Sequence, residues 1–322
     1  MRKTTAFLLF TFLVFTLSAQ FDGPVGTPGC QAISQDDPAI LGWATGCEVL
    51  RGYQDIATAV VTVSYGESED AIGKPDSDGM TVVSLGDSGV AILTFDIPIT
   101  NGEGYDFAVF ENSFSHTFLE LAFVEVSSNG ERWVRFPATS NTQTETQIDG
   151  FGHIDATQIN NLAGKYKIGW GTPFDLDELR DSADIDIDNI THVKIIDVIG
   201  TINPKYAQYD AYGNIVNDPY PTDFSSGGFD LAGVAILNGW QPATSIKENT
   251  ANVIQVYPNP CHDFITINNL KPNQMLSFYT ILGVKLWETI ATDGQLRIEV
   301  GDFPDGVYLL KVGNNSCKIV KR

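Results

Sequence analysis

Basic residues are scarce in this chain of 322 residues: 19 lysines and arginines face 40 aspartates and glutamates, and the formal net charge is −21 at pH 7. A surface with this much negative charge repels nucleic acid and anionic lipid, so the composition excludes polyanion-binding proteins. It suits divalent cations and neutral ligands instead. Acids also keep a secreted protein soluble, and this simpler explanation accounts for the composition equally well.

Long apolar runs are missing, with one exception at the start. Arg2-Lys3 precedes an apolar run over residues 6–17, broken only by two threonines, and the small residues Ser18-Ala19 follow it. The run is too short for a membrane span, and this pattern predicts a signal peptide over residues 1–19, cut after Ala19. Cleavage would change the formal charge to −23. We expect no membrane span after cleavage and no lipid anchor, because the first cysteine is Cys30.

Cysteines are few, and no C-x-x-C spacing occurs. Four cysteines in an exported chain favour disulfides over a thiolate metal site, because export favours oxidation. They form two local pairs, Cys30/Cys47 and Cys261/Cys317. Only this one of the three connectivities leaves the two ends of the chain unlinked, so we expect these two disulfides.

Recognised catalytic motifs are also absent. The sequence has no H-E-x-x-H, P-loop, G-x-S-x-G or dinucleotide fingerprint. The stretch Gly86-Asp87-Ser88-Gly89 resembles the nucleophile motif of chymotrypsin-like proteases, but no histidine precedes Ser88, as that triad order requires. A polar turn before a strand explains it better. A glycosidase needs only two carboxylates, and the motif search does not test for it.

What the sequence does contain is a series of short β-strand candidates between turn residues, with no long segment of helical period. This pattern predicts an all-β protein, with a jelly-roll-like β-sandwich over residues 20–240. One or two helical turns are expected over residues 173–180. The strand candidates are 59–63, 90–95, 107–110, 121–126, 133–136, 193–198 and 234–237.

The polar stretch at 241–252 is interpreted as a linker, and the amino-acid composition changes after it. Short strands separated by turn dipeptides then predict a small immunoglobulin-like β-sandwich over residues 253–322. Its strand candidates are 264–267, 276–279, 296–300, 307–312 and 318–322.

This second domain resembles the type A C-terminal sorting domain of type IX secretion substrates in Bacteroidetes. The resemblance rests on Tyr257-Pro258-Asn259-Pro260, the Gly283 turn, Gly306-Val307-Tyr308 and the basic end at Lys321-Arg322, in that order. It implies contact with the type IX secretion machinery and passage through the outer membrane. It also implies removal of the domain, followed by release or by attachment to the cell surface.

Residues 85–237 resemble a family of secreted bacterial surface proteins of unestablished function. The resemblance implies a fold and a location and leaves the ligand open. The matching stretches are 106–112, 124–130, 162–165, 169–176 and 227–231.

Acidic residues concentrate in loops and at expected strand ends. Asp106, Glu111 and Asp230 lie at such strand ends, where calcium would neutralise a carboxylate that is costly to bury unpaired. Asp76 and Asp78 alternate before Gly79, as in a short calcium loop. A structural calcium site is therefore expected, with hydrogen bonds to backbone N–H groups or pairing with basic residues as the alternative. The alternating acids at 184–188 would share one strand face, where solvation is the ordinary explanation.

Aromatic residues gather in a loop over 206–220 that also carries carboxylates and amides. Rings beside such groups suit a sugar, whose C–H face stacks on a ring while polar atoms bind its hydroxyls. We therefore expect a secreted or surface-displayed binding module for a glycan or other small extracellular ligand, held by Trp170, Tyr206, Tyr209 and Tyr212. The alternatives are a glycan-cleaving enzyme with a carboxylate pair and a purely structural or adhesive surface protein. Loop tyrosines that only cover the end of a sandwich would favour the last.

Overall fold

The computed structural model describes residues 21–239, 254–281, 283–313 and 315–322. The chain divides into two compact units, Met1–Gln241 and Pro242–Arg322, and each is described by itself. The expected signal peptide (1–19) and linker (241–252) lie outside the described residues. Among those described, no helix has the length and apolarity to cross a membrane.

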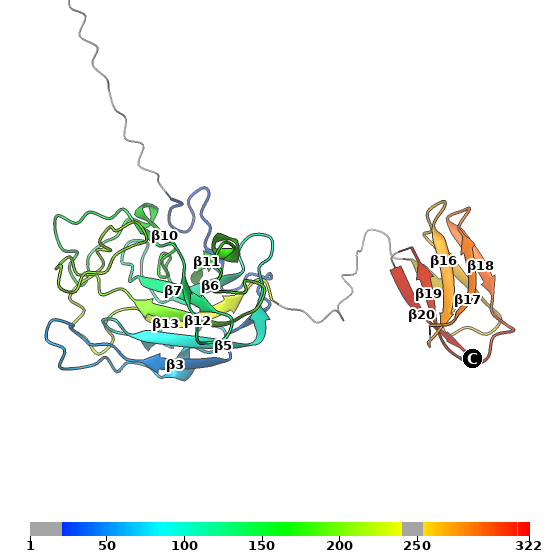
Figure 1. Ribbon diagram of the computed structural model, residues 1–322, viewed down its shortest axis with the longest axis horizontal. Coiled ribbons are helices and arrows are strands. Elements are labelled where there is room, and N and C mark those ends of the chain that lie inside the picture. Colours follow the sequence, from blue (N-terminus) through cyan, green and yellow to red (C-terminus); the bar gives the residue numbers. More distant parts are fainter. Residues whose placement is uncertain (1–20, 240–253, 282, 314) are drawn as a thin grey trace, which may run out of the picture. The chain divides into compact units, whose positions relative to one another are not determined.

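The N-terminal unit consists of two antiparallel sheets, whose strands carry the blue to yellow colours in Figure 1. In the first sheet the order is β1-β11-β6-β13-β2, and β4 also pairs with β13. Its strands are β1 (Ile33–Ser34), β2 (Gly42–Trp43), β4 (Val83–Ser84), β6 (Phe107–Glu111), β11 (Trp170–Phe174) and β13 (Asp230–Ile236). In the second sheet the order is β3-β5-β12-β7-β8. Its strands are β3 (Gly46–Leu50), β5 (Val90–Ile99), β7 (Ala122–Ser127), β8 (Val134–Arg135) and β12 (Ile190–Asp197).

The order of these strands is that of a jelly roll. From β5 to β7 and again from β11 to β13, the chain changes sheet at every step. The resulting orders β2-β13-β6-β11 and β5-β12-β7-β8 are the two four-stranded sheets of that fold. The predicted all-β class and jelly-roll-like sandwich are therefore confirmed.

The main core lies between the two sheets. Strand β12 alternates buried and half-buried residues, as a strand with one face on the core should. Strand β13 is buried throughout, because a second apolar cluster around Ala108 and Phe110 covers the outer face of the first sheet. Inside the sandwich, the ring of Phe107 stacks on Phe174 and meets Phe136 edge-on, with centroids 5.2 and 5.8 Å away.

Long connections and short 3₁₀ turns complete this unit. They comprise η1 (Ser68–Ala71), η2 (Ala156–Gln158), η3 (Leu176–Leu179) and the small pair β9 (Thr139–Ser140) and β10 (Ile159–Asn160). The expected helical turn within 173–180 is η3. One strand prediction is wrong: 59–63 contributes only a single bridge residue. Residues 184–188 form turns, and their aspartates are exposed, as the solvation explanation expects.

The C-terminal unit is a seven-stranded sandwich with sheets β14-β15-β18 and β17-β16-β19-β20. This is an immunoglobulin-like arrangement in which the fourth strand joins the sheet of the third. Its core gathers the inward residues of both sheets around Phe278 and Leu310. The strands are β14 (Gln255–Tyr257), β15 (Phe264–Asn268), β16 (Met275–Thr280), β17 (Lys285–Ile290), β18 (Gln295–Glu299), β19 (Gly306–Val312) and β20 (Asn315–Lys321).

The two expected disulfides are absent, and all four cysteines are free thiols. Cys47 lies in β3 of the second sheet, whereas Cys30 lies in the loop before β1 and belongs to no strand. Cys261 pairs with Lys321, four residues beyond Cys317 along β20. At about 3.3 Å per strand residue that offset is about 13 Å, well beyond the reach of a disulfide.

Candidate ligand-binding site

The loop between β12 and β13 carries the tyrosines singled out above, and Asp210 fixes its shape. The buried Asp210 carboxylate accepts hydrogen bonds from the backbone N–H groups of Ser140, Tyr212 and Asn214, at 2.8–2.9 Å. Burial alone would raise the pKa of Asp210, but these bonds and one from the Asn214 amide lower it. The Asp210 carboxylate therefore stays charged and ties the loop to β9.

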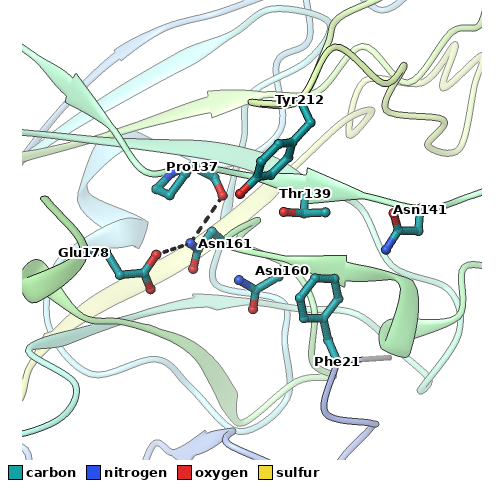
Figure 2. A pocket seen from close by; sticks show the side chains of 8 residues that line it. All are labelled: Phe21, Pro137, Thr139, Asn141, Asn160, Asn161, Glu178 and Tyr212. Atoms are coloured by element: carbon teal, nitrogen blue, oxygen red, sulfur yellow. Dashed lines mark hydrogen bonds between the residues drawn. The ribbon is translucent and has the colours of Figure 1, made fainter. Parts of the chain in front are cut away.

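Tyr212 stands on this anchored loop over a cavity of about 390 Å³, the Tyr212 cavity. Its ring is 71% exposed. In the view of Figure 2, Tyr212 lies above Asn160 and Asn161, and the Phe21 ring lies beside Asn160. The cavity is lined by Phe21, Pro137, Thr139, Asn141, Asn160, Asn161, Glu178 and Tyr212.

The polar wall of the Tyr212 cavity is partly pre-organised. The Asn161 amide donates to Glu178 at 2.6 Å and to the Pro137 carbonyl at 3.4 Å, as drawn in Figure 2. Asn161 holds a φ of +53°, a conformation that asparagine tolerates better than most residues. Partial burial raises the pKa of Glu178, against the lowering effect of the Asn161 bond. The wall therefore offers three asparagine amides, the Thr139 hydroxyl and the Glu178 carboxyl group beside the rings of Tyr212 and Phe21.

A second cavity of about 400 Å³ adjoins the first and shares Asn141 with it. Its remaining lining is polar side chains and the loop backbone beside Tyr212: Ser140, Thr142, Thr144, Gly213, Asn214 and Ile215. The two hollows therefore form a continuous polar surface along β9 and the Tyr212 loop.

The four predicted aromatic ligands do not form one group. Tyr212 lines the cavity, whereas Trp170 begins β11 opposite Ser34 and does not line it. Tyr209 is exposed on the same loop, and Tyr206 lies under the Lys205 ammonium, 4.7 Å from its ring centre. The sequence did not predict Phe21, Asn160, Asn161 or Glu178 as site residues. The small polar run at 139–144 is the one sequence signal that points to this surface.

The predicted calcium ligands are also separated. Asp106 and Glu111 lie at opposite ends of β6, and Asp106 accepts bonds from Leu176 N, Gly102 N and the Asn238 amide. Asp76 and Asp78 are exposed and bind within their own loop. Only Glu111 and Asp230 come together, where β6 pairs with β13. In the described part of the chain, no three histidine, cysteine or acidic side chains are placed to hold a metal ion. The calcium site stays a prediction.

Glu111 and Asp230 belong to a larger group that the sequence analysis missed, which we name the acid cluster. Its members are at most 8% exposed, and each feels the charge of at least one other member or adjacent acid. None forms an ion pair with a described residue. Burial, then mutual repulsion, raises the pKa of most of these carboxyls. The cluster comprises Asp87, Glu111, Glu120, Asp197, Asp218 and Asp230.

Comparison with known proteins gives one firm match. Residues 255–322 match the family described as the secretion system C-terminal sorting domain. No curated protein matches the chain significantly.

Three solved structures are distantly similar. PorZ, a surface component of the type IX secretion system of Porphyromonas gingivalis, is 14% identical with a TM-score of 0.20, over 87% of this chain and 43% of PorZ. A Parabacteroides merdae β-glucuronidase is 12% identical with a TM-score of 0.21, over 94% and 36%. The BSP domain of a biofilm associated protein is 10% identical with a TM-score of 0.17, over 72% and 48%. The chain spans less than half the length of each, and at these TM-scores the likenesses carry no functional argument.

Proposed function

Because the chain carries the C-terminal sorting domain of type IX secretion substrates and is exported to the cell exterior, we propose that its N-terminal unit is an extracellular binding module for a glycan. The ligand lies in the Tyr212 cavity. Export places the module among polysaccharides and other soluble nutrients outside the cell. The sorting domain delivers the protein, and the N-terminal unit binds.

The observation that carries this proposal is the exposed Tyr212 ring held above a row of amide side chains. A pyranose presents an apolar C–H face and a rim of hydroxyls, and it needs a ring for the first and hydrogen-bond partners for the second. Tyr212 and Phe21 supply the rings. Asn141, Asn160 and Glu178 supply donors and acceptors around them.

Rigidity favours binding at this place. The Asp210 bonds hold the backbone of Tyr212 before any ligand arrives, so less conformational entropy is lost on binding. The adjoining cavity beyond Asn141 adds room for a second sugar unit. An oligosaccharide therefore fits the paired hollows better than a single monosaccharide.

A binding role is favoured over glycan cleavage by the acids present. Hydrolysis of a glycosidic bond usually needs two carboxylates, roughly 5–10 Å apart, on either side of the bond. Among the residues that line the Tyr212 cavity, Glu178 is the single carboxylate, and it is bonded to Asn161. One acid can orient a hydroxyl but cannot supply both roles.

The test is a glycan array probed with the purified secreted protein, followed by calorimetry on any ligand found. Tyr212→Ala should weaken binding about tenfold, equivalent to about 1.4 kcal/mol for a lost stacking contact. Tyr209→Ala is the matched control, because Tyr209 lies on the same loop, is 49% exposed and does not line the cavity. Equal loss in both variants, or loss in Tyr209→Ala alone, would place the ligand elsewhere.

A further inference from the structure

A third cavity, of about 450 Å³, lies apart from the Tyr212 cavity and shares no residue with it. We name it the phenylalanine cavity. Four phenylalanines and two acids of the acid cluster line it: Phe114, Phe118, Phe151, Phe224, Glu120 and Asp230. Gly150 and small residues of the 222–227 loop complete its wall.

The four rings form a continuous series of contacts. Ring centres are 5.9 Å apart from Phe114 to Phe118, 6.0 Å from Phe118 to Phe151 and 5.5 Å from Phe151 to Phe224. Phe114 and Phe151 are 75% and 68% exposed. Exposed apolar groups of this size that gather in one place mark a binding surface.

Glu120 provides the second, independent observation. It lines the cavity, is only 8% exposed and forms no side-chain hydrogen bond or ion pair with any described residue. A carboxylate left without a partner at such burial is costly. The Glu120 carboxyl group is therefore a buried acceptor that faces the cavity and has no donor or cation among the described residues.

The neighbouring charges do not supply the missing partner. Asp230, Glu111, Asp218 and Asp197 all act on Glu120 with the same negative sign. Arg51 acts on Asp230, but its guanidinium is taken up by the backbone carbonyls of Tyr65, Ser84 and Gly66. No basic side chain of the described residues neutralises Glu120, so a proton or a cation from outside the chain does so.

We propose that the phenylalanine cavity binds a small organic cation, with an alkylammonium group seated against Glu120 and enclosed by the phenylalanine rings. Ring faces attract cations that are weakly hydrated, and they do so best when water is excluded. A calcium ion would instead need six to eight oxygen ligands. A neutral apolar ligand would leave Glu120 buried and unpartnered. The proposal does not depend on glycan binding at the Tyr212 cavity.

The test compares choline with 3,3-dimethyl-1-butanol, the uncharged molecule of nearly the same shape, by calorimetry on the full chain. Choline should bind at least tenfold more tightly than the alcohol. Glu120→Gln should abolish this preference, whereas Glu131→Gln, which changes an exposed glutamate outside the cavity, should leave it intact. Phe151→Leu should weaken choline binding and Phe151→Tyr should restore it, because tyrosine keeps the ring.

Thermal melts show whether each variant is folded, and Tyr212→Ala should bind choline normally. Four results would overturn the inference. They are equal binding of choline and the alcohol, equal choline affinity in Glu120→Gln and wild type, displacement of choline by calcium, and no binding of choline, tetramethylammonium or butylammonium up to about 10 mM. A failed choline test leaves the glycan proposal standing, and a glycan array without a ligand leaves the choline proposal standing.

Discussion

The two units of this chain are both β-sandwiches, but they differ in how many acidic side chains they bury. The described C-terminal unit buries no carboxylate: its buried polar side chains are Ser277 and Lys321. The N-terminal unit buries the six acids of the acid cluster, and Asp106 and Asp210 as well. A fold needs no buried acids to be stable, since burial of unpaired charge is costly. Asp87, Asp197 and Asp218 accept hydrogen bonds from backbone N–H groups, so these acids help to hold the fold. The Glu120 side chain bonds to no described residue, and the contrast therefore singles it out as the acid that folding does not explain.

The largest expected effects come from the two cores, which test whether the units unfold independently. Phe107→Ala removes a ring packed on Phe174 and Phe136, and Phe278→Ala removes one packed on Phe303 and Tyr308. Each substitution should lower the free energy of unfolding of the unit that contains it by about 3–5 kcal/mol. Calorimetry should show two transitions, of which each variant shifts one. A single transition, moved by both variants, would contradict independent units.

Calcium should stabilise only the N-terminal unit. A site filled at a hundred times its dissociation constant adds about 2.7 kcal/mol. The structure limits the ligands: Glu111→Gln and Asp230→Asn should remove the gain, whereas Asp106→Asn should not, because Asp106 is satisfied by Leu176, Gly102 and Asn238. Melts in chelator and in millimolar calcium that coincide would rule the site out.

Acidification should stabilise the N-terminal unit. Burial raises the pKa of Asp87 to about 7 and that of Asp230 to about 6, from 3.8. A carboxyl with a raised pKa binds its proton more tightly in the folded state, so stability is greatest below the unfolded value and falls as pH rises through the folded value. The N-terminal transition should therefore fall by several degrees between about pH 4 and pH 7.

Asp87→Asn is the matched variant for this pH effect. It keeps an oxygen for the Ile56 N–H and removes the charge, so it should raise the melting temperature at neutral pH and flatten the pH profile. An N-terminal transition that rises with pH over this range would show that the acid cluster is stabilised by charge, contrary to our interpretation.

The smallest expected effect concerns the thiols. Reductant should leave both transitions unchanged, because no cysteine is bonded to another. Burial, followed by the charges of Glu69 and Glu48, raises the pKa of Cys47 to about 12. Alkylation of the native protein should therefore be slow at Cys47 and fast after unfolding. A peptide linking Cys30 to Cys47 in unreduced protein would contradict the free thiols.

Strand existence was predictable where the side-chain pattern is simple. In the C-terminal unit, the apolar and β-branched run Phe264-Ile265-Thr266-Ile267 lies in β15, where Ile265 and Ile267 are buried and Thr266 between them is half-buried. Residues 59–63 are as apolar and β-branched as any strand, yet Val60 and Val61 are exposed in a loop. Propensity describes a residue's fit to a pleated surface, and it cannot show whether a neighbouring strand is present to pair with.

The site was predicted only in part, for a similar reason. Tyr212 could be named, since a loop tyrosine among amides and acids is a local signal. Asn160, Asn161 and Glu178 could not, because they meet Tyr212 only through the pairing of β9 with β10 and the position of η3. Glu120 carried a local signal that was overlooked: it lies between Leu119 and Leu121, both fully buried. An acid within an apolar run indicates a buried charge.

The sequence by itself determined the export pathway, the all-β class and the two sandwiches, because these depend on local motifs, turn residues and the two-residue period of strands. Only the tertiary structure decided the state of the cysteines, the separation of Asp106 from Glu111 and Asp230, and the gathering of Glu120 with the phenylalanines. Each of these depends on which strands become neighbours in the jelly roll. Neighbours in that fold are brought together by crossings between sheets, and the residues that meet are too far apart in the chain for any local pattern to relate them.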